Sequence, residues 1–280
     1  MNNILVLQSD FGLADGAVAA MLGVAHEISK DLRIHNLTHD ITPYNIWEAS
    51  YRLFQTCKYW PEGTVFVSVV DPGVGSARKS VVAKTSSGQY IVTPDNGTLT
   101  HMKKFIGIDA VREIEESVHR RKDSEHSHTF HGRDVYAYTG AKLAANEINF
   151  EDVGNELSVD RIIENKTGDV IKTETSISGC IDILDVRFGS LWTNISSDDF
   201  RSVGFKHGHR IEVLIKNGPT VVYNNRIIYD KSFDAVYVGE QIIYTNSLMR
   251  TAVAINQGNF ARAYSIGTGI HWTIEFKKIE

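Results

Sequence analysis

The sequence predicts an α/β N-terminal domain, a mostly parallel sheet flanked by helices, followed by a small all-β barrel C-terminal domain. Two observations lead to this prediction. Strand-like and helix-like segments alternate through the first half of the 280-residue chain, which is typical of an α/β sheet. After about residue 150 the pattern changes to short β-rich segments separated by turn pairs such as Asn217-Gly218.

The segments of the first half differ in their hydrophobic pattern. Residues 4–8 and 64–70 are short apolar runs that predict buried strands, whereas residues 46–59 repeat apolar side chains with helical periodicity. Residues 16–28 are rich in alanine, which favours a helix. The expected strands are 4–8, 32–37, 64–70, 81–84 and 90–92, and the expected helices are 16–28, 46–59 and 133–146.

The second half consists of short apolar runs bounded by turn residues. We expect strands at residues 181–186, 190–195, 210–215, 220–224, 235–238 and 241–244. The stretch between residues 153 and 175 is polar. It suggests an N-terminal domain at residues 1–160, a linker at 161–175 and a C-terminal domain at 176–280.

Composition narrows the class of protein. The apolar fraction of 42% and the charged fraction of 22% are those of a globular protein. A net charge of -5 disfavours a nucleic-acid binder, and the basic run Arg120-Arg121-Lys122 lies among acidic residues, so it is interpreted as a solvated loop. Cys57 and Cys180 lack the spacing of a disulfide framework or zinc site. Without a signal peptide or a run long enough to span a membrane, we expect a cytoplasmic protein.

A glycine-rich turn directly follows the apolar strand at residues 64–70. Asp71 and Arg78 stand seven residues apart across it, separated by Pro72, Gly73 and Gly75. Glycines allow a ligand to approach the backbone, and a neighbouring guanidinium favours the ionised form of a carboxyl group. The turn lacks the Lys-Ser/Thr pair and the third glycine of phosphate-binding loops, so a nucleotide-phosphate site is disfavoured.

Acidic turns recur in the first half. Asp10, Asp71 and Asp95 each follow a strand-like run, and Asp134 begins the last helical segment. Ligands bind outside the carboxyl ends of strands in open α/β sheets, so several such turns are expected to line one crevice. A single one of them would be only a chain reversal.

Three histidines precede that last helical segment. His126, His128 and His131 form an H-x-H-x-x-H pattern with acidic neighbours, which suggests a metal site. No second ligand cluster accompanies it, and we predict no metal. His131, beside Phe130 and Gly132, is the sharper functional candidate, with a structural histidine at a helix start as the alternative.

The second half holds two further candidates. Asp185, Phe188 and Gly189 interrupt a strand, and the exposed aromatic ring would offer a flat face for stacking. Asn246 and Ser247 end another strand with small hydrogen-bonding groups. A barrel corner and a simple turn are the alternatives for these segments.

Together these motifs resemble one family. The order Ser-Asp10-Phe-Gly, Val-Val-Asp71-Pro-Gly-Val-Gly, Pro-Asp-Asn-Gly, Thr-Phe130-His131-Gly-Arg-Asp, Asp185-x-x-Phe188-Gly and Asn246-Ser is similar to that of the S-adenosyl-L-methionine (SAM) hydroxide adenosyltransferases (DUF62 proteins), relatives of the SAM-dependent fluorinase and chlorinase. The resemblance implies metal-independent hydrolysis of SAM to adenosine and L-methionine, with SAM as substrate and no cofactor. It also implies a homotrimer with sites between subunits.

The resemblance implies a role for each candidate residue. Asp71, Arg78 and His131 correspond to the water-activating set that halogenases lack, and Gly132 stands where halogenases carry a halide-binding serine. The substrate-binding positions are Asp10 at the ribose diol, Tyr44 and Phe130 as aromatic walls, and Asp185, Phe188, Ser190, Asn246 and Ser247 around the adenine and methionine.

Three positions depart from the family pattern. Ser190 replaces an asparagine, Met249 replaces a glycine, and Ala252 replaces a glutamate. These changes affect the ligand shell and leave the water-activating set intact. The alternatives to a SAM hydrolase are therefore a non-catalytic adenosine or SAM binder, a SAM-dependent halogenase and, last, a metal hydrolase.

Overall fold

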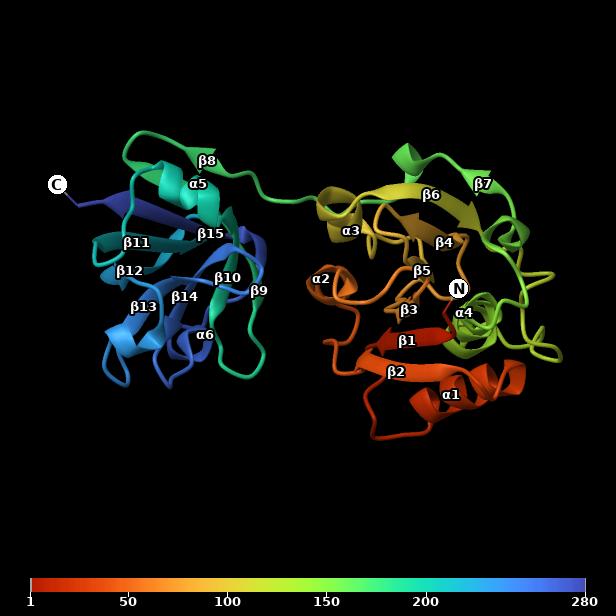
Figure 1. Cartoon of the computed structure of the whole chain (residues 1–280). Helices are drawn as coiled ribbons and strands as arrows, with labels where there is room; N and C mark the ends of the chain where they lie inside the picture. The colour runs from red at the N-terminus through yellow and green to blue at the C-terminus, as the bar shows by residue number, and fades with distance from the viewer. Residues whose placement is uncertain (1, 280) are drawn as a thin grey trace. The chain divides into compact units, whose positions relative to one another are not determined.

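The computed structural model describes residues 2–279, which form two compact units, residues 2–165 and 166–279 (Figure 1). The first unit is α/β and the second is a β-barrel. The division falls between residues 165 and 166. Within residues 161–175, Ile171–Lys172 form β8, which pairs with β9 (Ser176–Leu184) of the barrel.

A sheet with a parallel core organises the first unit. In spatial order its strands are β2 (Arg33–Thr38), β1 (Ile4–Ser9), β3 (Val65–Val69), β5 (Tyr90–Pro94), β4 (Ser80–Thr85), β6 (Ile108–Glu113) and β7 (Glu156–Leu157). The first four run parallel, and β4, β6 and β7 add antiparallel pairs. Every residue of β1 and β3 is buried, as expected where helices cover both faces of a parallel sheet.

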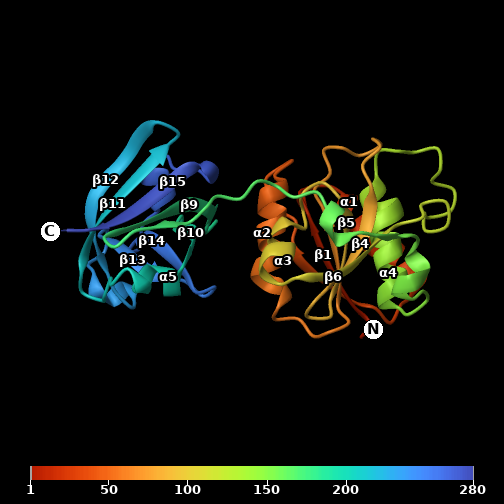
Figure 2. The same cartoon turned by 90° about the horizontal axis from the view of Figure 1, so that it is seen from above.

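Helices form a layer on each face of this sheet. α2 (Ile46–Cys57) and α3 (Thr100–Phe105) lie on one face, and α1 (Ala17–Ile28) and α4 (Tyr138–Ala144) lie on the other (Figure 2). α2 begins where the Asn45 side chain accepts a hydrogen bond from the Glu48 backbone N–H at 3.0 Å, a normal N-cap. Short 3₁₀ turns, η2 (Phe150–Val153) and η3 (Val159–Arg161), lead out of the unit.

The helix expected at residues 133–146 differs in form. It begins as a π-helix, η1 (Gly132–Ala137), and continues as α4 to Ala144. π-helical turns are rare and often mark functional sites. This one starts directly after His131, so the irregular turn sets the position of that side chain.

Seven strands of the second unit's described residues close into a barrel. The ring order is β10 (Leu191–Ser196), β14 (Arg250–Ile255), β13 (Gln241–Thr245), β12 (Thr220–Tyr229), β11 (Arg210–Asn217), β15 (Gly269–Lys278) and β9, and pairing of β9 with β10 closes it. Alternate residues of β11 point inward, Ile211, Val213 and Ile215, as barrel strands require. The short helices α5 (Ser197–Ser202) and α6 (Phe260–Ala263) and the 3₁₀ turn η4 (Phe233–Ala235) complete the unit.

One expected strand is wrong. Residues 235–238 form the end of η4 and a loop, and Tyr237 and Val238 are exposed. The Asn256 amide donates hydrogen bonds to the carbonyl oxygens of Phe233 and Val236, at 3.1 and 2.9 Å, which holds the segment as a loop.

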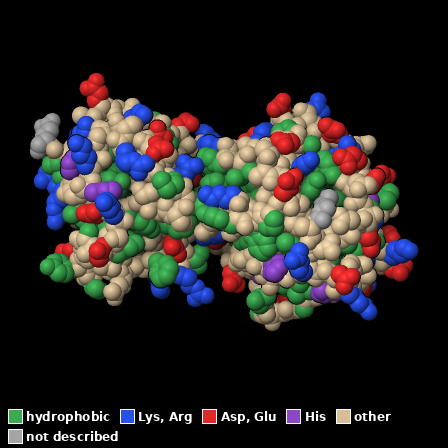
Figure 3. Space-filling view, in the orientation of Figure 1, with side chains coloured by type: hydrophobic (Ala, Val, Ile, Leu, Met, Phe, Trp, Pro, Cys, Tyr) green, Lys and Arg blue, Asp and Glu red, His purple; other side chains and the backbone are tan. Residues whose placement is uncertain are grey.

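The surface charge and the character of the helices relate to the predictions of no nucleic-acid partner and no membrane partner. Lys/Arg and Asp/Glu side chains are interspersed over the face seen in Figure 3. None of the helices formed by residues 2–279 combines the length and apolar character needed to traverse a bilayer. Cys57 and Cys180 are both buried, and neither forms a disulfide among residues 2–279.

The packing of α4 on the sheet yields a stability prediction. Gly140 of α4 is buried against Val67 of β3, and a Cβ atom there would overlap the Val67 side chain. Gly140→Ala should therefore destabilise the protein by about 1–3 kcal/mol, as overpacking does. In calorimetry the midpoint of thermal unfolding should fall.

Gly23→Ala provides the matched control in α1. Gly23 is exposed and a Cβ atom there meets nothing within 4 Å, so the midpoint should rise slightly because alanine favours helix. Equal shifts for the two variants would contradict the described packing of α4.

Candidate active site

A buried ion pair follows β3. The Arg78 Nε–H donates to Asp71 Oδ1 at 2.8 Å, and the Nη2 group donates to Asp71 Oδ2. The two side chains are only 9% and 5% exposed. A bidentate arginine–carboxylate pair is strong and geometrically specific. The structure therefore presents Asp71 as a carboxylate held in one orientation.

Glycines shape the loop between these two residues. Gly75 has φ +78°, in the left-handed region that favours glycine, and a Cβ atom there would lie 3.2 Å from the His128 carbonyl oxygen. At Gly73, a Cβ atom would lie 3.3 Å from Ser76 Oγ. The loop can thus pack against the segment before His131, which brings Arg78 and His131 together.

His131 meets the ion pair through one ring nitrogen. Its Nδ1 lies 3.0 Å from Arg78 Nη2. A guanidinium only donates hydrogen bonds, so Nδ1 accepts this one from Arg78. Burial lowers the pKa of His131, and the charges of Arg78 and Arg120 lower it further against the opposing effect of Glu116. The imidazole is therefore neutral at neutral pH.

Arg120 is a site residue that the sequence interpretation missed. Its Nη1 group donates to Glu116 Oε2 at 3.2 Å and lies 3.4 Å from His131 Nε2, and its Nη2 group donates to the Ser127 carbonyl oxygen at 2.7 Å. The side chain is 9% exposed, so the solvated-loop interpretation is wrong for Arg120. Arg121 does pair with a partly exposed partner, Glu27. The i,i+4 spacing of Glu116 and Arg120 was the available signal.

Ser80 and Tyr136 complete the network behind Asp71. Ser80 Oγ accepts from Arg78 Nη1 at 3.0 Å and donates to Glu116 Oε1 at 2.8 Å. The Tyr136 hydroxyl lies 3.2 Å from Ser80 Oγ and donates to Asp71 Oδ2 at 3.4 Å. Burial raises the pKa of Tyr136 well above its ordinary value, so this hydroxyl stays neutral. Neither residue belonged to a motif in the sequence.

A cavity of about 360 Å³ lies in front of this network. It is lined by Asp10, Phe11, Pro43, Tyr44, Val69, Asp71, Val74, Thr129, Phe130, His131 and Gly132. The carboxyl ends of β1 and β3 supply its two carboxylates, as expected for an α/β sheet. Arg78 stands behind Asp71 and is not among the lining residues.

Aromatic side chains form walls of this cavity. The Phe11 and Phe130 rings meet edge-on at 5.7 Å, and the Arg133 guanidinium lies 4.9 Å from the Phe130 ring centre. Tyr44 has φ +68°, an unfavourable conformation for an aromatic residue, and its backbone N–H donates to Asp10 Oδ2 at 2.9 Å. Tyr44 is 73% exposed.

Two of the four acidic side chains in these turns serve the fold instead of the cavity. Asp95 accepts the Ile163 backbone N–H at 2.9 Å, and burial raises its pKa. Asp134 is fully buried and pairs with Arg133. Of the four turns, those of Asp10 and Asp71 line the cavity, as do His131 and Gly132 of the fourth turn, whereas the turn of Asp95 does not.

The histidine cluster of the sequence does not assemble. His131 joins the buried network, whereas His126 and His128 do not line the cavity. Within residues 2–279, no group of three or more His, Cys, Asp or Glu side chains is arranged to hold a metal ion. The H-x-H-x-x-H alternative has no ligand set there.

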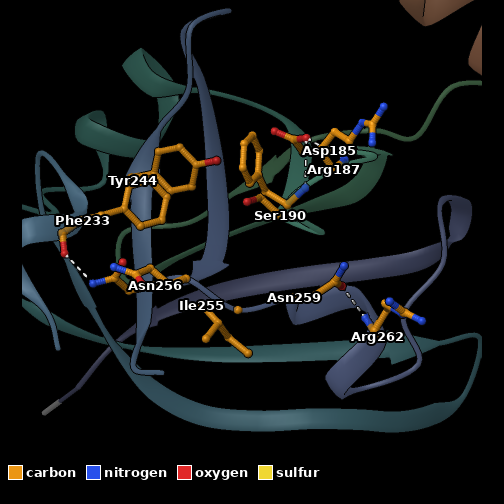
Figure 4. Close-up of a pocket in the computed structure, with 12 residues that line it drawn as sticks. Asp185, Arg187, Ser190, Phe233, Tyr244, Ile255, Asn256, Asn259 and Arg262 are labelled. Carbon is orange, nitrogen blue, oxygen red and sulfur yellow. Dashed lines mark hydrogen bonds between the residues drawn. The ribbon is translucent and has the colours of Figure 1, made fainter. Parts of the chain in front are cut away.

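The barrel unit holds a second cavity, of about 760 Å³ (Figure 4). Its lining residues are Asp185, Arg187, Phe188, Ser190, Phe233, Tyr244, Ile255, Asn256, Gln257, Gly258, Asn259 and Arg262. Figure 4 shows the Phe233 and Tyr244 rings side by side, and their centres are 5.0 Å apart. Three candidate residues from the sequence, Asp185, Phe188 and Ser190, thus line this cavity, and Phe188 is 70% exposed.

Gly189 fixes the corner between Phe188 and Ser190. It has φ +66°, and a Cβ atom there would overlap the Asn259 side chain. Asn259 lines the cavity and accepts the Arg262 backbone N–H at 2.8 Å through its side-chain oxygen (Figure 4). An amide side chain therefore faces the cavity although the family's asparagine at position 190 is absent.

Asn246 and Ser247 lie outside the residues that line this cavity. The Asn246 side-chain oxygen accepts the backbone N–H groups of Leu248 and Arg250, at 2.9 and 3.0 Å, and so holds the turn between β13 and β14. Ser247 is exposed on that turn. Met249 keeps φ +57°, the conformation a glycine would favour, and its side chain is exposed. Ala252 is buried in β14 opposite Trp192 and Tyr244.

Two family models match the chain. The model of the SAM hydroxide adenosyltransferase N-terminal domain matches residues 5–154, and the model of the C-terminal domain matches residues 179–273. The chain belongs to the SAM hydroxide adenosyltransferase family. Both cavities lie within the matched domains.

Individual relatives support this family membership. The chain is 39% identical over 222 residues to an (R)-S-adenosyl-L-methionine hydrolase of Methanocaldococcus jannaschii, covering 77% of this chain and 75% of that protein. A fluorinase of an Actinoplanes species is 27% identical and covers 98% of this chain and 97% of its own. A crystal structure of a conserved Thermotoga maritima protein superposes with a TM-score of 0.88 at 32% identity, covering 98% of this family member and 100% of that chain.

The contact of Arg120 with His131 can be tested by titration. Arg120→Met removes a positive charge beside the imidazole, so protonation becomes easier and the pKa of His131 should rise. NMR titration of the His131 ring resonances measures this directly. Arg121→Met, one residue away and paired with Glu27, should leave the titration unchanged. An unaltered His131 titration in Arg120→Met would show that the two side chains do not interact.

Proposed function

We propose that this protein hydrolyses SAM by attack of water at the ribose C5′ atom. The water oxygen forms a bond to C5′, the C5′–S bond breaks with its electron pair going to sulfur, and one proton is released. The products are adenosine and L-methionine. The observation that supports this most is the oriented Asp71 carboxylate beside a neutral His131 at the wall of one cavity.

The chemistry suits these residues. A sulfonium is a good leaving group and no oxyanion develops, so we propose that neither a metal nor another cofactor takes part. The site must instead hold one water in line with the C–S bond, and positioning of this kind contributes ~7–11 kcal/mol. A dry cavity also favours the reaction, because a hydroxide-like nucleophile neutralises a cation in it.

Each of the three central residues has a separate role in this proposal. Asp71 accepts the hydrogen bond and then the proton of the attacking water. Arg78 holds Asp71 ionised and in one orientation. We propose that His131, which lines the same cavity and is held by Arg78, positions the same water.

The remaining candidate residues are assigned to the substrate. We propose that Asp10 binds the ribose diol and that Tyr44 and Phe130 form aromatic walls. For the barrel unit, Asp185, Phe188, Ser190, Asn246 and Ser247 are proposed to contact the adenine and methionine parts.

We also propose a homotrimer in which the N-terminal unit of one subunit meets the C-terminal unit of the next. Each unit carries its own cavity, and each cavity has an exposed aromatic side chain, Tyr44 or Phe188. Burying these rings against a neighbouring subunit and the substrate would be favourable.

A halogenase is disfavoured at Gly132. A Cβ atom there would lie 3.0 Å from two atoms of the Phe11 ring, so a serine at this position requires the ring to move. The carboxylate of Asp71 would also repel a halide. Incubation with SAM and chloride or fluoride should therefore give no 5′-halo-5′-deoxyadenosine.

Isotope-labelled water tests the hydrolysis directly. The protein is incubated in ¹⁸O-water with the R and S sulfonium epimers of SAM separately, because several relatives are named for the R form. We expect one ¹⁸O atom in the 5′-hydroxyl of adenosine. Tight adenosine binding without labelled product from either epimer would instead indicate a non-catalytic binder.

Two variants test the assigned roles. Asp71→Asn and His131→Ala should lower kcat by about 10²–10⁴-fold, the usual contribution of such groups, with little change in adenosine affinity measured by calorimetry. The control is Asp31→Asn, which changes an exposed carboxylate that lines neither cavity. Equal losses of binding and rate would contradict the assignment.

A further inference from the structure

Under the proposed function, on which the following inference rests, hydrolysis of SAM leaves one proton on Asp71, a group that water reaches poorly. The attacking water loses its proton to Asp71, whose side chain is only 5% exposed before any substrate covers it. Asp71 must return to its ionised form before the next turnover, so the protein needs a path for this proton.

The side chains behind Asp71 form such a path. The Tyr136 hydroxyl lies 3.4 Å from Asp71 Oδ2, Ser80 Oγ lies 3.2 Å from the Tyr136 hydroxyl, and Glu116 Oε1 lies 2.8 Å from Ser80 Oγ. The Glu116 side chain is 35% exposed. The chain of oxygens thus leads from the buried carboxylate to one that reaches solvent.

Both intermediate groups can pass a proton on. A hydroxyl is a donor and an acceptor at once, so Tyr136 can accept from protonated Asp71 while it donates to Ser80. Once Asp71 is protonated and the Tyr136 hydroxyl turns toward Ser80, Ser80 Oγ accepts from Arg78 Nη1 and Tyr136 and has its one proton for Glu116. In this arrangement no two groups of the network point their hydrogen atoms at each other.

Charge favours transfer in the outward direction. Arg78 contacts Asp71 and Ser80, which disfavours a proton held at either position. Partial burial acts to raise the pKa of Glu116, but the Ser80 hydroxyl and Arg120 lower it. Glu116 is therefore ionised at neutral pH, ready to accept a proton and to release it to water.

We propose that Tyr136, Ser80 and Glu116 form the proton exit of this enzyme. The proton taken from water by Asp71 passes to the Tyr136 oxygen as the Tyr136 proton moves to Ser80 and the Ser80 proton moves to Glu116. Glu116 then gives its proton to solvent, and the hydroxyl hydrogens turn back. Charge and atoms balance, since each oxygen gains one proton and loses one.

His131 offers the competing path, and the structure disfavours it. The imidazole lies between the Arg78 and Arg120 guanidiniums, at 3.0 and 3.4 Å, and a protonated ring would add a third positive charge there. Glu116 and Asp71 are the acidic groups that oppose this effect. His131 is thereby suited to orient the water and not to carry its proton.

The test uses the full-length protein and measures kcat at fixed pH and ionic strength with increasing imidazole buffer. In Glu116→Gln, kcat should fall by about tenfold, less than the loss of a general base itself, because water accepts the proton slowly. Imidazole should restore it, because Glu116 is partly exposed. Glu115→Gln, an exposed neighbour outside the network, should match the wild type at every buffer concentration.

Tyr136→Phe tests the interior step. It removes the hydroxyl and keeps the ring against which Arg78 packs at 5.6 Å. Its kcat should fall without recovery in imidazole, its solvent deuterium isotope effect should rise, and its KM should stay unchanged.

Two results would overturn the proton exit. One is a Glu116→Gln kcat equal to that of Glu115→Gln, and the other is a lowered kcat that does not depend on buffer. Failure of the proposed function itself is separate, because wild-type protein would then form no labelled adenosine.

Discussion

The bidentate contact between Asp71 and Arg78 is the interaction on which the site depends. Both side chains are almost fully buried. Removing one partner of a buried pair leaves an uncompensated charge and typically costs about 3–5 kcal/mol. The surrounding groups satisfy the rest of this pair, since Arg78 also donates to Ser80 and to His131. One guanidinium thereby orients a carboxylate, a hydroxyl and an imidazole.

This contact also explains the local sequence. The loop must return from Asp71 to Arg78 while it packs against the His128 carbonyl, and Gly75 permits this with a positive φ. The segment that follows His128 then enters a π-helix at Gly132, so His131 faces the ion pair. The glycine-rich turn resembles a phosphate loop in composition, but its backbone conformation allows Asp71 and Arg78 to pair.

Much of this arrangement could be predicted from the sequence. Parallel strands bring their carboxyl ends to one edge, so apolar runs followed by Asp10 and Asp71 were enough to place both near one crevice. The same pattern failed at Asp95, because its carboxylate accepts a backbone N–H from residue 163, a contact that no local pattern encodes.

The roles of other residues could not be recognised from the local sequence. Arg120 stood in a charged run that indicates solvent exposure, and only the fold buries it beside His131. Tyr136 and Ser80 read as ordinary core and strand residues, since hydroxyl networks have no sequence period. Residues 235–238 have strand-like composition, but the Asn256 amide, some twenty residues later, holds them as a loop.

The central claim is that Asp71 holds a water that displaces methionine in one step. The stereochemical course at C5′ tests it most directly. SAM carrying deuterium at a single C5′ position is hydrolysed, and the configuration of the resulting adenosine is determined. The account predicts inversion, because the water attacks opposite the leaving sulfur. Retention would contradict it, since two successive displacements through an ester on a carboxylate would then be required.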